Sequence, residues 1–242
     1  MVAVAGRRLE APSTLAAAAE LGAPARVVED VSRGAEVVIL TVPDDAIAAV
    51  ARAVVGSVDA GVLVIHVAGS RGLEVFGEGA GLRPDVRFGA LHPLVSIPTP
   101  DPRHLDGGWC AVAGDLEVYE LADALGLQAF TVADGDRARY HAAASIAANH
   151  VVALLSQVER LAESAAVPRA AFYPLVRGVV ANAEAIGPRD ALTGPVKRGD
   201  RETVDRHLAA LAPEERALYR AVAAEALRLS GRDDPELEAR LR

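Results

Sequence analysis

The sequence predicts an α/β domain built on a parallel sheet, followed by an all-α domain. Over residues 2–132, short apolar and often β-branched runs alternate with alanine-rich stretches of helical spacing, which is typical of βαβ units. Several of these runs are apolar at nearly every position, as expected of strands covered on both faces. From residue 136 to about residue 230 no period-two run occurs, and almost every segment has helical spacing.

The first domain is expected to contain short strands that mostly lead into capped helices. The expected strands are residues 2–5, 26–28, 37–42, 62–67, 87–91, 109–113 and 128–132. The helices expected between them run over residues 13–22, 44–55 and 115–126. Serine or aspartate stands at each helix start as an N-cap, and glycine follows the first and last helix as a stop signal.

The second half is expected to be helical. One long helix is predicted over residues 137–166, and Pro168 suits the first turn of a helix reaching Ile186. Two more are predicted over residues 201–211 and 214–230, after a loop with two prolines and three glycines at residues 187–200. The predicted domains are therefore residues 1–135 and 136–231, followed by a charged, loosely packed tail at residues 232–242.

Composition excludes several classes of protein. The chain has 242 residues, with 25 basic and 33 acidic residues and a formal net charge of −8, so a surface that neutralises nucleic acid is not expected. No apolar run is long enough for a membrane span, and none forms a secretory signal. Cys110 is the only cysteine, which rules out a disulfide framework and favours a reducing, cytoplasmic location.

Polar residues follow three of the predicted strands, where open α/β sheets bind ligands. Asp44 and Asp45 follow the third strand; their ordinary role is to cap a helix. His66 ends the fourth strand and is equally consistent with a hydrogen-bonded sheet-end histidine and with a site residue. His92 ends the fifth strand before a proline that restricts the backbone, which favours a directed, functional side chain.

A polar stripe lies on the long helix. His141, Ser145 and Asn149 follow one another at four-residue spacing and point to one side, among alanines that allow close approach. The stripe either bonds a neighbouring helix or is catalytic. In the catalytic reading, a histidine with a pKa near ~6.5 suits proton transfer, and an amide orients a carbonyl or carboxylate.

The loop at residues 187–200 also has two interpretations. Its glycines lack the spacing of a phosphate loop, and a turn is its ordinary explanation. Alternatively, Arg189, Lys197 and Arg198 flank a mostly apolar tripeptide at residues 191–193 and would offer cations to an anionic substrate.

Five stretches together resemble a known family. They are residues 41–45 (Thr-Val-Pro-Asp-Asp), 66–69, 91–94 (Leu-His-Pro-Leu), 140–149 and 191–200 (Ala-Leu-Thr-Gly-Pro-Val-Lys-Arg-Gly-Asp). They resemble bacterial proteins with a Rossmann-like domain followed by the helical domain of unknown function 2520. The resemblance runs from about residue 2 to residue 229, and the last stretch is the most specific.

The resemblance implies a fold and an activity. Proteins of this plan are similar to 6-phosphogluconate dehydrogenase-like enzymes, such as pyrroline-5-carboxylate reductase and ketopantoate reductase, and some act as an alternative ketopantoate reductase. It therefore implies a doubly wound Rossmann-like sheet, NADPH as cofactor, hydride transfer to a small 2-oxo acid such as ketopantoate, and a homodimer formed through the helical domain.

The resemblance also assigns roles to residues. Val42, Pro43 and Asp44 would lie beside the cofactor ribose and residues 66–70 near the nicotinamide; His141 or His92 would donate the proton, and Asn149 would hold the carbonyl or carboxylate. Similar enzymes often use a lysine as the acid on this helix, and none occurs here. The implied site residues are catalytic His92, His141, Ser145 and Asn149; cofactor-binding Arg7, Arg8, Val42, Pro43, Asp44, His66, Gly69 and Ser70; and substrate-binding Thr193, Lys197 and Arg198.

The sequence departs from the family at its start. Family members begin with a strand and a Gly-x-Gly-x-x-Gly turn that binds the pyrophosphate, and the sequence contains no such turn. Met1 falls where the second strand of the family begins, and the absent strand would lie between residues 2–5 and 37–42. Either the first strand moves next to residues 37–42, or, as we expect, the protein starts upstream. Arg7 and Arg8 lie at the end of the strand that corresponds to the second strand of the family, where an arginine suits the 2′-phosphate of NADP.

Two other functions remain open. A non-catalytic, dimeric small-molecule-binding protein that has lost dinucleotide binding is the main alternative, because the glycine turn is absent. A metal enzyme would need His66, His92 and His141 to converge. The sequence has no helical His-x-x-x-His and no carboxylate at ligand spacing, so no metal is expected.

Overall fold

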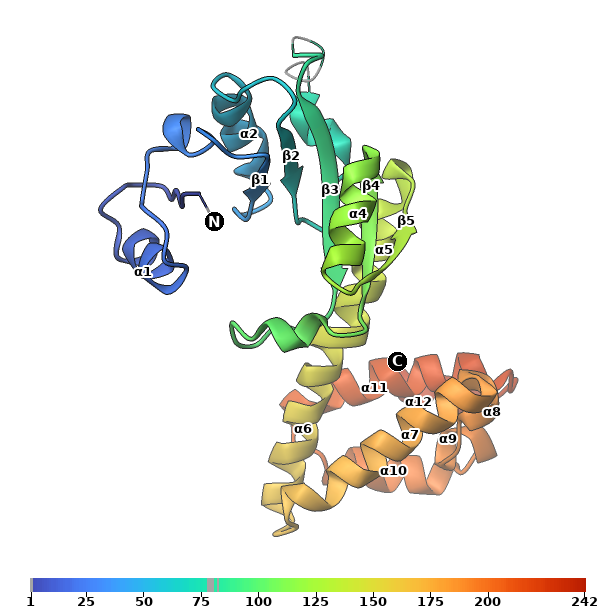
Figure 1. Ribbon diagram of the computed structural model, residues 1–242. Coiled ribbons are helices and arrows are strands. Elements are labelled where there is room, and N and C mark those ends of the chain that lie inside the picture. The colour runs from blue at the N-terminus through green and yellow to red at the C-terminus, as the bar shows by residue number, and fades with distance from the viewer. Residues whose placement is uncertain (1, 78–80, 82) are drawn as a thin grey trace. The chain divides into compact units, whose positions relative to one another are not determined.

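The computed structural model describes residues 2–77, 81 and 83–242. The chain divides into two compact units, Met1–His150 and Val151–Arg242, whose elements are labelled in Figure 1. The first unit holds the sheet and the second is helical, so the predicted succession of an α/β and an all-α part is confirmed. The division falls between residues 150 and 151, whereas the sequence placed it between residues 135 and 136.

The first unit is built on a five-stranded sheet in the order β1-β2-β3-β4-β5. The strands are β1 (Val37–Leu40), β2 (Leu63–His66), β3 (Arg87–Leu94), β4 (Trp109–Gly114) and β5 (Gln128–Thr131). β1, β2 and β3 are parallel, whereas β4 is antiparallel to β3 and parallel to β5. The predicted parallel sheet therefore forms with one exception, the antiparallel pairing of β4 with β3. The connection from β3 to β4 contains a short 3-10 helix, η3 (Pro102–Leu105), and not the α-helix that usually returns the chain between parallel strands.

The strands expected at residues 2–5 and 26–28 do not form, which corrects the prediction. One isolated bridge joins Val4 to Ala25 across helix α1 (Pro12–Glu20). Residues 2–5 therefore do not move next to β1, and among the described residues β1 is paired only with β2. Met1 lies outside the described residues. Along β1, Val37 and Ile39 are 39% and 49% exposed.

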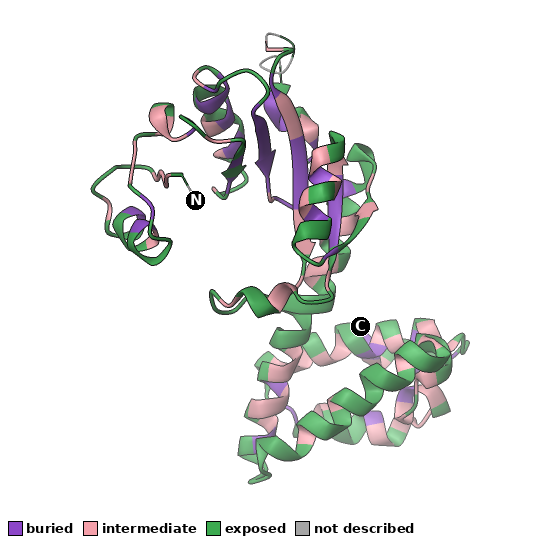
Figure 2. Cartoon of the chain, in the orientation of Figure 1, coloured by how far each residue is buried: buried purple, intermediate pink, exposed green. Residues whose placement is uncertain are grey.

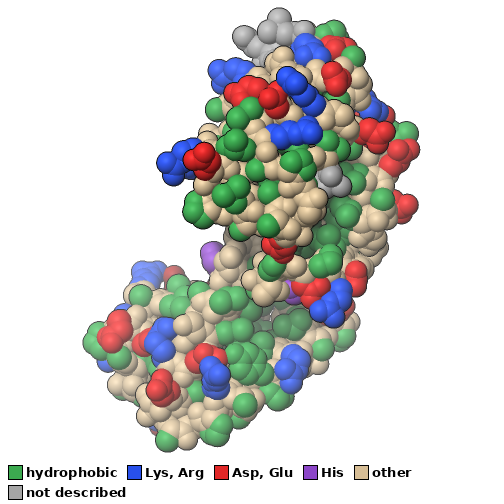
Figure 3. Space-filling model, turned by 60° about the vertical axis from the view of Figure 1, so that its left-hand side comes forward, with side chains coloured by type: hydrophobic (Ala, Val, Ile, Leu, Met, Phe, Trp, Pro, Cys, Tyr) green, Lys and Arg blue, Asp and Glu red, His purple; other side chains and the backbone are tan. Residues whose placement is uncertain are grey.

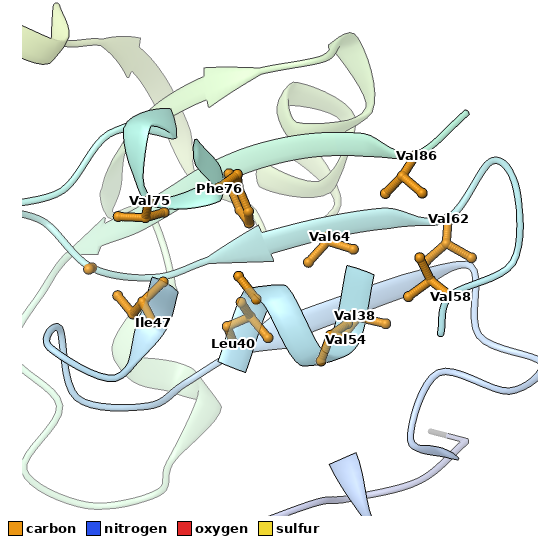
Figure 4. Close-up of a cluster of buried hydrophobic side chains, with 12 residues drawn as sticks. Val38, Leu40, Ile47, Val54, Val58, Val62, Val64, Val75, Phe76 and Val86 are labelled. Atoms are coloured by element: carbon orange, nitrogen blue, oxygen red, sulfur yellow. The ribbon is translucent and has the colours of Figure 1, made fainter. Parts of the chain in front are cut away.

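Helices cover both faces of the sheet, as Figure 4 shows for one of them. Alternate residues of a strand point to opposite faces. Val64 of β2 packs in the cluster that contains helix α2 (Ile47–Val55), and Ile65 packs in the cluster that contains helix α4 (Leu116–Ala124). The sheet is thus wound on both sides, and its strand β2, which lies between β1 and β3, is buried throughout (Figure 2).

Helix starts differ from the predicted caps at two places. Asp115 is the N-cap of α4, as predicted. The N-cap of α1 is Ala11 rather than Ser13, and that of α2 is Ala46 rather than Asp44 or Asp45; neither cap has a side-chain hydrogen bond. Asp44 and Asp45 lie in the turn between β1 and α2, so neither aspartate is the N-cap of that helix.

The predicted long helix forms, with a change of pitch in its middle. It consists of α5 (Arg137–Ser145), a π-helical turn, η5 (Ile146–His150), and α6 (Val151–Ser164). Short 3-10 helices lie elsewhere in the first unit: η1 (Val28–Asp30), η2 (Leu73–Phe76) and η4 (Asp134–Asp136). Helical π-turns are frequent at functional sites.

The helical unit contains more elements than the sequence indicates. The predicted helices appear as α7 (Phe172–Ile186), α10 (Arg201–Ala210) and α11 (Pro213–Ser230). A short 3-10 helix, η6 (Arg169–Ala171), precedes α7. The expected loop at residues 187–200 contains two single-turn helices, α8 (Pro188–Ala191) and α9 (Pro195–Arg198). None of the described helices combines the length and apolar character that a membrane crossing needs.

The charged tail expected at residues 232–242 is instead a packed helix, α12 (Pro235–Leu241). Asp234 accepts a hydrogen bond from the backbone N–H of Leu237 and caps the helix. Leu237 and Leu241, four residues apart, are 0% and 5% exposed and join the core of the helical unit.

On the face shown in Figure 3, acidic, basic and hydrophobic side chains are interspersed.

Candidate active site

His66 shapes the turn at the carboxyl end of β2. It is fully buried, its Nδ1 accepts a hydrogen bond from the N–H of Ala68 at 3.2 Å, and its Nε2 lies 3.0 Å from the carbonyl oxygen of Gly72. Because Nδ1 is an acceptor, the proton is on Nε2 and is donated to Gly72. Burial lowers the pKa of His66 below its ordinary value. Both ring nitrogens are therefore engaged in holding the turn that presents Gly69 and Ser70.

Two further histidines converge on Gly69. A Cβ placed on Gly69 would lie 2.6 Å from Nδ1 of His141 and 2.7 Å from Nε2 of His92. The two rings are edge-on, with centroids 5.6 Å apart. Nδ1 of His92 is 2.7 Å from the hydroxyl of Tyr140, whose ring also packs on Phe130 of β5. The structure thus brings together the predicted residues His92 and His141 and adds Tyr140.

The alternation of side chains along β3 explains this convergence. Gly89 and Leu91 face α4, so His92 faces the opposite side, where α5 packs. His66 is on the same side, because its neighbour Ile65 faces α4. β2 ends opposite Ala90, and β3 continues past it to Leu94. The site therefore lies at the carboxyl end of β2, over the second half of β3.

The electrostatics of the cluster favour neutral side chains. Burial, with contributions from the charges of His141 and Arg137, lowers the pKa of His92 to about 4. Burial raises the pKa of the Tyr140 phenol. At neutral pH His92 is therefore uncharged and Tyr140 keeps its proton, so that the pair shares one hydrogen bond through which a proton can move. Nδ1 of His141 is buried and has no hydrogen-bond partner.

The first residue of α5, Arg137, is a site residue that the sequence analysis missed. Its side chain is 1% exposed, and its charge lowers the pKa values of both His66 and His92. One signal was available: a basic residue in the first turn of a helix opposes the helix dipole and calls for a local explanation. The position of Arg137 beside two histidines supplies one.

The predicted cofactor residues after β1 lie beside the glycine turn. The hydroxyl of Ser70 donates a hydrogen bond to Asp44 at 2.6 Å, which joins the ends of β1 and β2. Val42 packs on the apolar cluster under α2, whereas Pro43 is exposed. Arg7 and Arg8 are exposed beyond the Val4 bridge. The structure brings together Asp44, Gly69 and Ser70; no contact joins Arg7 or Arg8 to this group in the described residues.

The helical stripe is altered by the π turn. Ser145 is the last residue of α5, and Asn149 falls within η5. An α-helix would place Asn149 over Ser145, but the wider turn rotates the residues that follow it, and Asn149 is exposed. Of the three stripe residues, only His141 is held in the cluster at Gly69.

The predicted substrate residues belong to the second unit. Thr193 precedes Gly194, which begins α9, and Lys197 and Arg198 are in its single turn. The ammonium of Lys197 lies 3.5 Å from the carbonyl oxygen of Arg189. The role of these three residues in substrate binding stays a prediction.

A hollow lies at the start of β3, apart from the histidine cluster. It measures about 700 Å³ and is lined by residues that include Phe76, Phe88 and Leu116. Two of its charged groups are paired with each other, because Arg87 donates to Glu117 and also to the carbonyl of Gly61. The histidine cluster, with unpaired buried nitrogens, is the better candidate for chemistry. No group of three or more potential metal ligands gathers among the described residues.

The comparisons with known proteins agree with this architecture. The Rossmann-like domain family matches residues 7–93, and the domain of unknown function DUF2520 matches residues 111–226. None of the curated proteins compared with the chain has a matching sequence.

Several solved structures have the same fold. A Bacteroides fragilis protein provisionally named an NADP oxidoreductase is 21% identical with a TM-score of 0.77, covering 94% of this chain and 88% of its own. A Thermotoga maritima protein is 23% identical with a TM-score of 0.74, and the match covers 95% of this chain and 92% of that protein. Pyrroline carboxylate reductase of Plasmodium falciparum, solved with NADP bound, is 11% identical with a TM-score of 0.59, and the match covers 99% of this chain and 87% of that protein. The chain is therefore similar over residues 7–93 to a Rossmann-like domain and over residues 111–226 to a DUF2520 domain, and these solved structures share its fold.

Proposed function

We propose that the protein is an NADP-dependent oxidoreductase that reduces a small 2-oxo acid, with ketopantoate as the first candidate. The convergence of His92, Tyr140 and His141 on Gly69 carries this proposal. These groups can supply a proton at the carboxyl end of β2, the edge at which open α/β sheets bind ligands. The likeness to structures of oxidoreductases supports the fold of such an enzyme.

The residues at the strand ends fit one half of the cofactor. Val42, Pro43 and Asp44 would border the ribose, and Gly69 and Ser70 would border the nicotinamide. Gly69 suits this place because its face toward the histidines has no room for a side chain. Arg7 and Arg8, both exposed, would meet the 2′-phosphate. The sequence has no Gly-x-Gly-x-x-Gly turn for the pyrophosphate, so the fit covers the nicotinamide half and the 2′-phosphate.

The side chains of the cluster would manage the proton of the reaction. If NADPH binds here, it would supply the hydride that the carbonyl carbon accepts, and the electron pair of the carbonyl bond would pass to the oxygen. That oxygen then needs a proton, which His141 donates, with His92 as the other candidate. Nδ1 of His141 has no protein partner and is free to bond the substrate. The orienting role expected of Ser145 and Asn149 stays a prediction, because the π turn leaves Asn149 exposed. The product is a 2-hydroxy acid.

Steady-state turnover tests this assignment. NADPH consumption is followed with ketopantoate for the wild type, His141→Ala and, as a control, His150→Ala, an exposed histidine of the same helix. We expect His141→Ala to lower turnover by ~10²- to 10⁴-fold with little change in NADPH affinity, and His150→Ala to leave it unchanged. Equal turnover in wild type and His141→Ala would remove His141 as the donor.

The alternative is a dimeric small-molecule-binding protein without dinucleotide chemistry. The absent glycine turn is the observation that favours it. Both functions share the helical homodimer, which we infer from the unburied apolar residues of α7. A reducing, cytoplasmic compartment is inferred from the single, unpaired Cys110.

A further inference from the structure

The guanidinium of Arg137 is buried without hydrogen-bond partners. Nε, Nη1 and Nη2 all lack an acceptor, although the side chain is only 1% exposed. Among the described residues, its one ion-pair partner is Asp134, whose Oδ1 lies 3.5 Å from Nε. The Asp134 side chain is itself 56% exposed. The two terminal nitrogens, which form the fork that arginine uses for bidentate contacts, are left without any partner.

Such an arrangement is unfavourable unless a ligand completes it. Buried donors that lose water without gaining an acceptor destabilise the folded chain, and a buried charge does so more strongly. The surroundings offer no anion of their own to the fork. Arg137 lowers the pKa of His66, His92 and Tyr140, which places its charge among three side chains that are neutral at pH 7.

A second unpartnered group lies in the same cluster. Nδ1 of His141 is also buried without a partner, and His141 stands one helical turn after Arg137, at four-residue spacing on α5. Two unsatisfied groups on one face of one helix indicate a ligand with two acceptors close together. One acceptor must be anionic to compensate the guanidinium; the other need only accept or take up a proton.

We propose that Arg137 binds the carboxylate of the substrate, while His141 and the His92–Tyr140 pair face the neighbouring carbonyl oxygen. A planar carboxylate matches the arginine fork in a bidentate contact. In a 2-oxo acid the carbonyl is bonded directly to the carboxylate carbon, so both acceptors lie within the span of one helical turn. This assignment rests on the proposed function for its choice of acid, and it makes Arg137 the residue that selects 2-oxo acids over simple ketones.

The probe for this site is 2-oxoisovalerate, with isopropyl methyl ketone as its counterpart without a carboxylate. Each is titrated calorimetrically into the protein, alone and with saturating NADP⁺. The wild type is expected to bind the acid and to bind the ketone at least about tenfold more weakly, as the loss of hydrogen bonds to a charged group predicts. Arg137→Met is expected to weaken binding of the acid by at least about tenfold and to leave binding of the ketone unchanged.

Arg139→Met is the matched control. Arg139 lies on the same helix two residues away, but its side chain is 83% exposed and pairs with Asp136. It is expected to bind the acid as the wild type does. Thermal denaturation gives an independent measurement: without ligand, Arg137→Met should melt at the same or a higher temperature than the wild type, because an apolar side chain replaces an uncompensated charge. A merely structural Arg137 would give a lower melting temperature.

Three results would overturn the assignment. They are binding of the acid by Arg137→Met within about twofold of the wild type, equal binding of acid and ketone by the wild type, and binding of inorganic phosphate through Arg137 in place of the 2-oxo acid. The proposed function fails separately: a protein that binds 2-oxoisovalerate through Arg137 but does not consume NADPH would keep this site and lose the reductase activity.

Discussion

At the scale of single residues, His92 makes the stability of the protein depend on pH. An unfolded histidine takes up a proton near pH ~6.5, whereas His92 in the folded protein does so at about pH 4. Between these values the unfolded chain binds more protons, so the free energy of unfolding should fall as pH decreases from ~6.5 to about 4. His66, whose pKa burial also lowers, acts in the same direction.

Urea denaturation across this pH range measures the effect. His92→Gln should reduce the pH dependence while His66 keeps part of it, and His150→Gln, which changes an exposed histidine, should not alter it. If the pH dependence of His92→Gln matched that of the wild type, His92 would not be held neutral by the fold.

The candidate site could be predicted in part from single residues. His92 was found because a polar side chain at a strand end, followed by proline, is unusual, and His141 because it opens a polar stripe among alanines. Tyr140 and Arg137 were missed, since neither has a distinctive spacing. Their roles depend on the packing of α5 on the sheet. Tyr140 bonds His92 although the two residues are 48 positions apart in the sequence, and Arg137 matters only because it is buried.

At the scale of elements, α12 shows where composition misleads. Residues 232–242 are rich in charge, yet Asp234, Pro235 and two leucines four residues apart are sufficient for a capped helix with one apolar face. We predict that Leu237→Ala lowers the free energy of unfolding of the helical unit by ~2–5 kcal/mol, because Leu237 is fully buried.

Chemical denaturation followed by circular dichroism tests this prediction. Glu238→Ala, which alters an exposed i,i+4 ion pair with Arg242 on the same helix, should change the free energy by less than ~1 kcal/mol. Equal, small effects of both substitutions would mean that the tail is not part of the core.

Other elements were beyond the sequence for topological reasons. The apolar pattern of β4 locates a strand but does not give its direction, which is antiparallel to β3 after a connection without an α-helix. The pattern of residues 2–5 and 26–28 resembles strands, but a strand needs neighbours, and these segments pair only through one bridge. The π turn after Ser145 leaves no mark in the apolar period and was not predicted.

At the scale of the whole molecule, α7 predicts association of two copies. No residue of this helix is buried in the chain, although Leu175, Val179 and Val180 are 63%, 55% and 60% exposed. A two-fold axis would bury the same residues of both copies. We predict a homodimer by light scattering, a monomer for Val179→Asp, and a dimer for Arg177→Ala, which changes a polar residue of the same helix. A monomeric wild type would contradict this.

Binding of NADPH distinguishes the reductase from the non-catalytic binding protein. The protein is denatured thermally with NADPH, with NADH and without ligand, and its affinity is measured by titration. We expect NADPH at ~100 times its dissociation constant to stabilise the fold by ~2.7 kcal/mol, and NADH to bind more weakly because it lacks the 2′-phosphate offered to Arg7 and Arg8. If NADPH neither stabilised the protein nor bound measurably, the proposed reductase activity would be wrong. The non-catalytic, small-molecule-binding role would then be the remaining hypothesis.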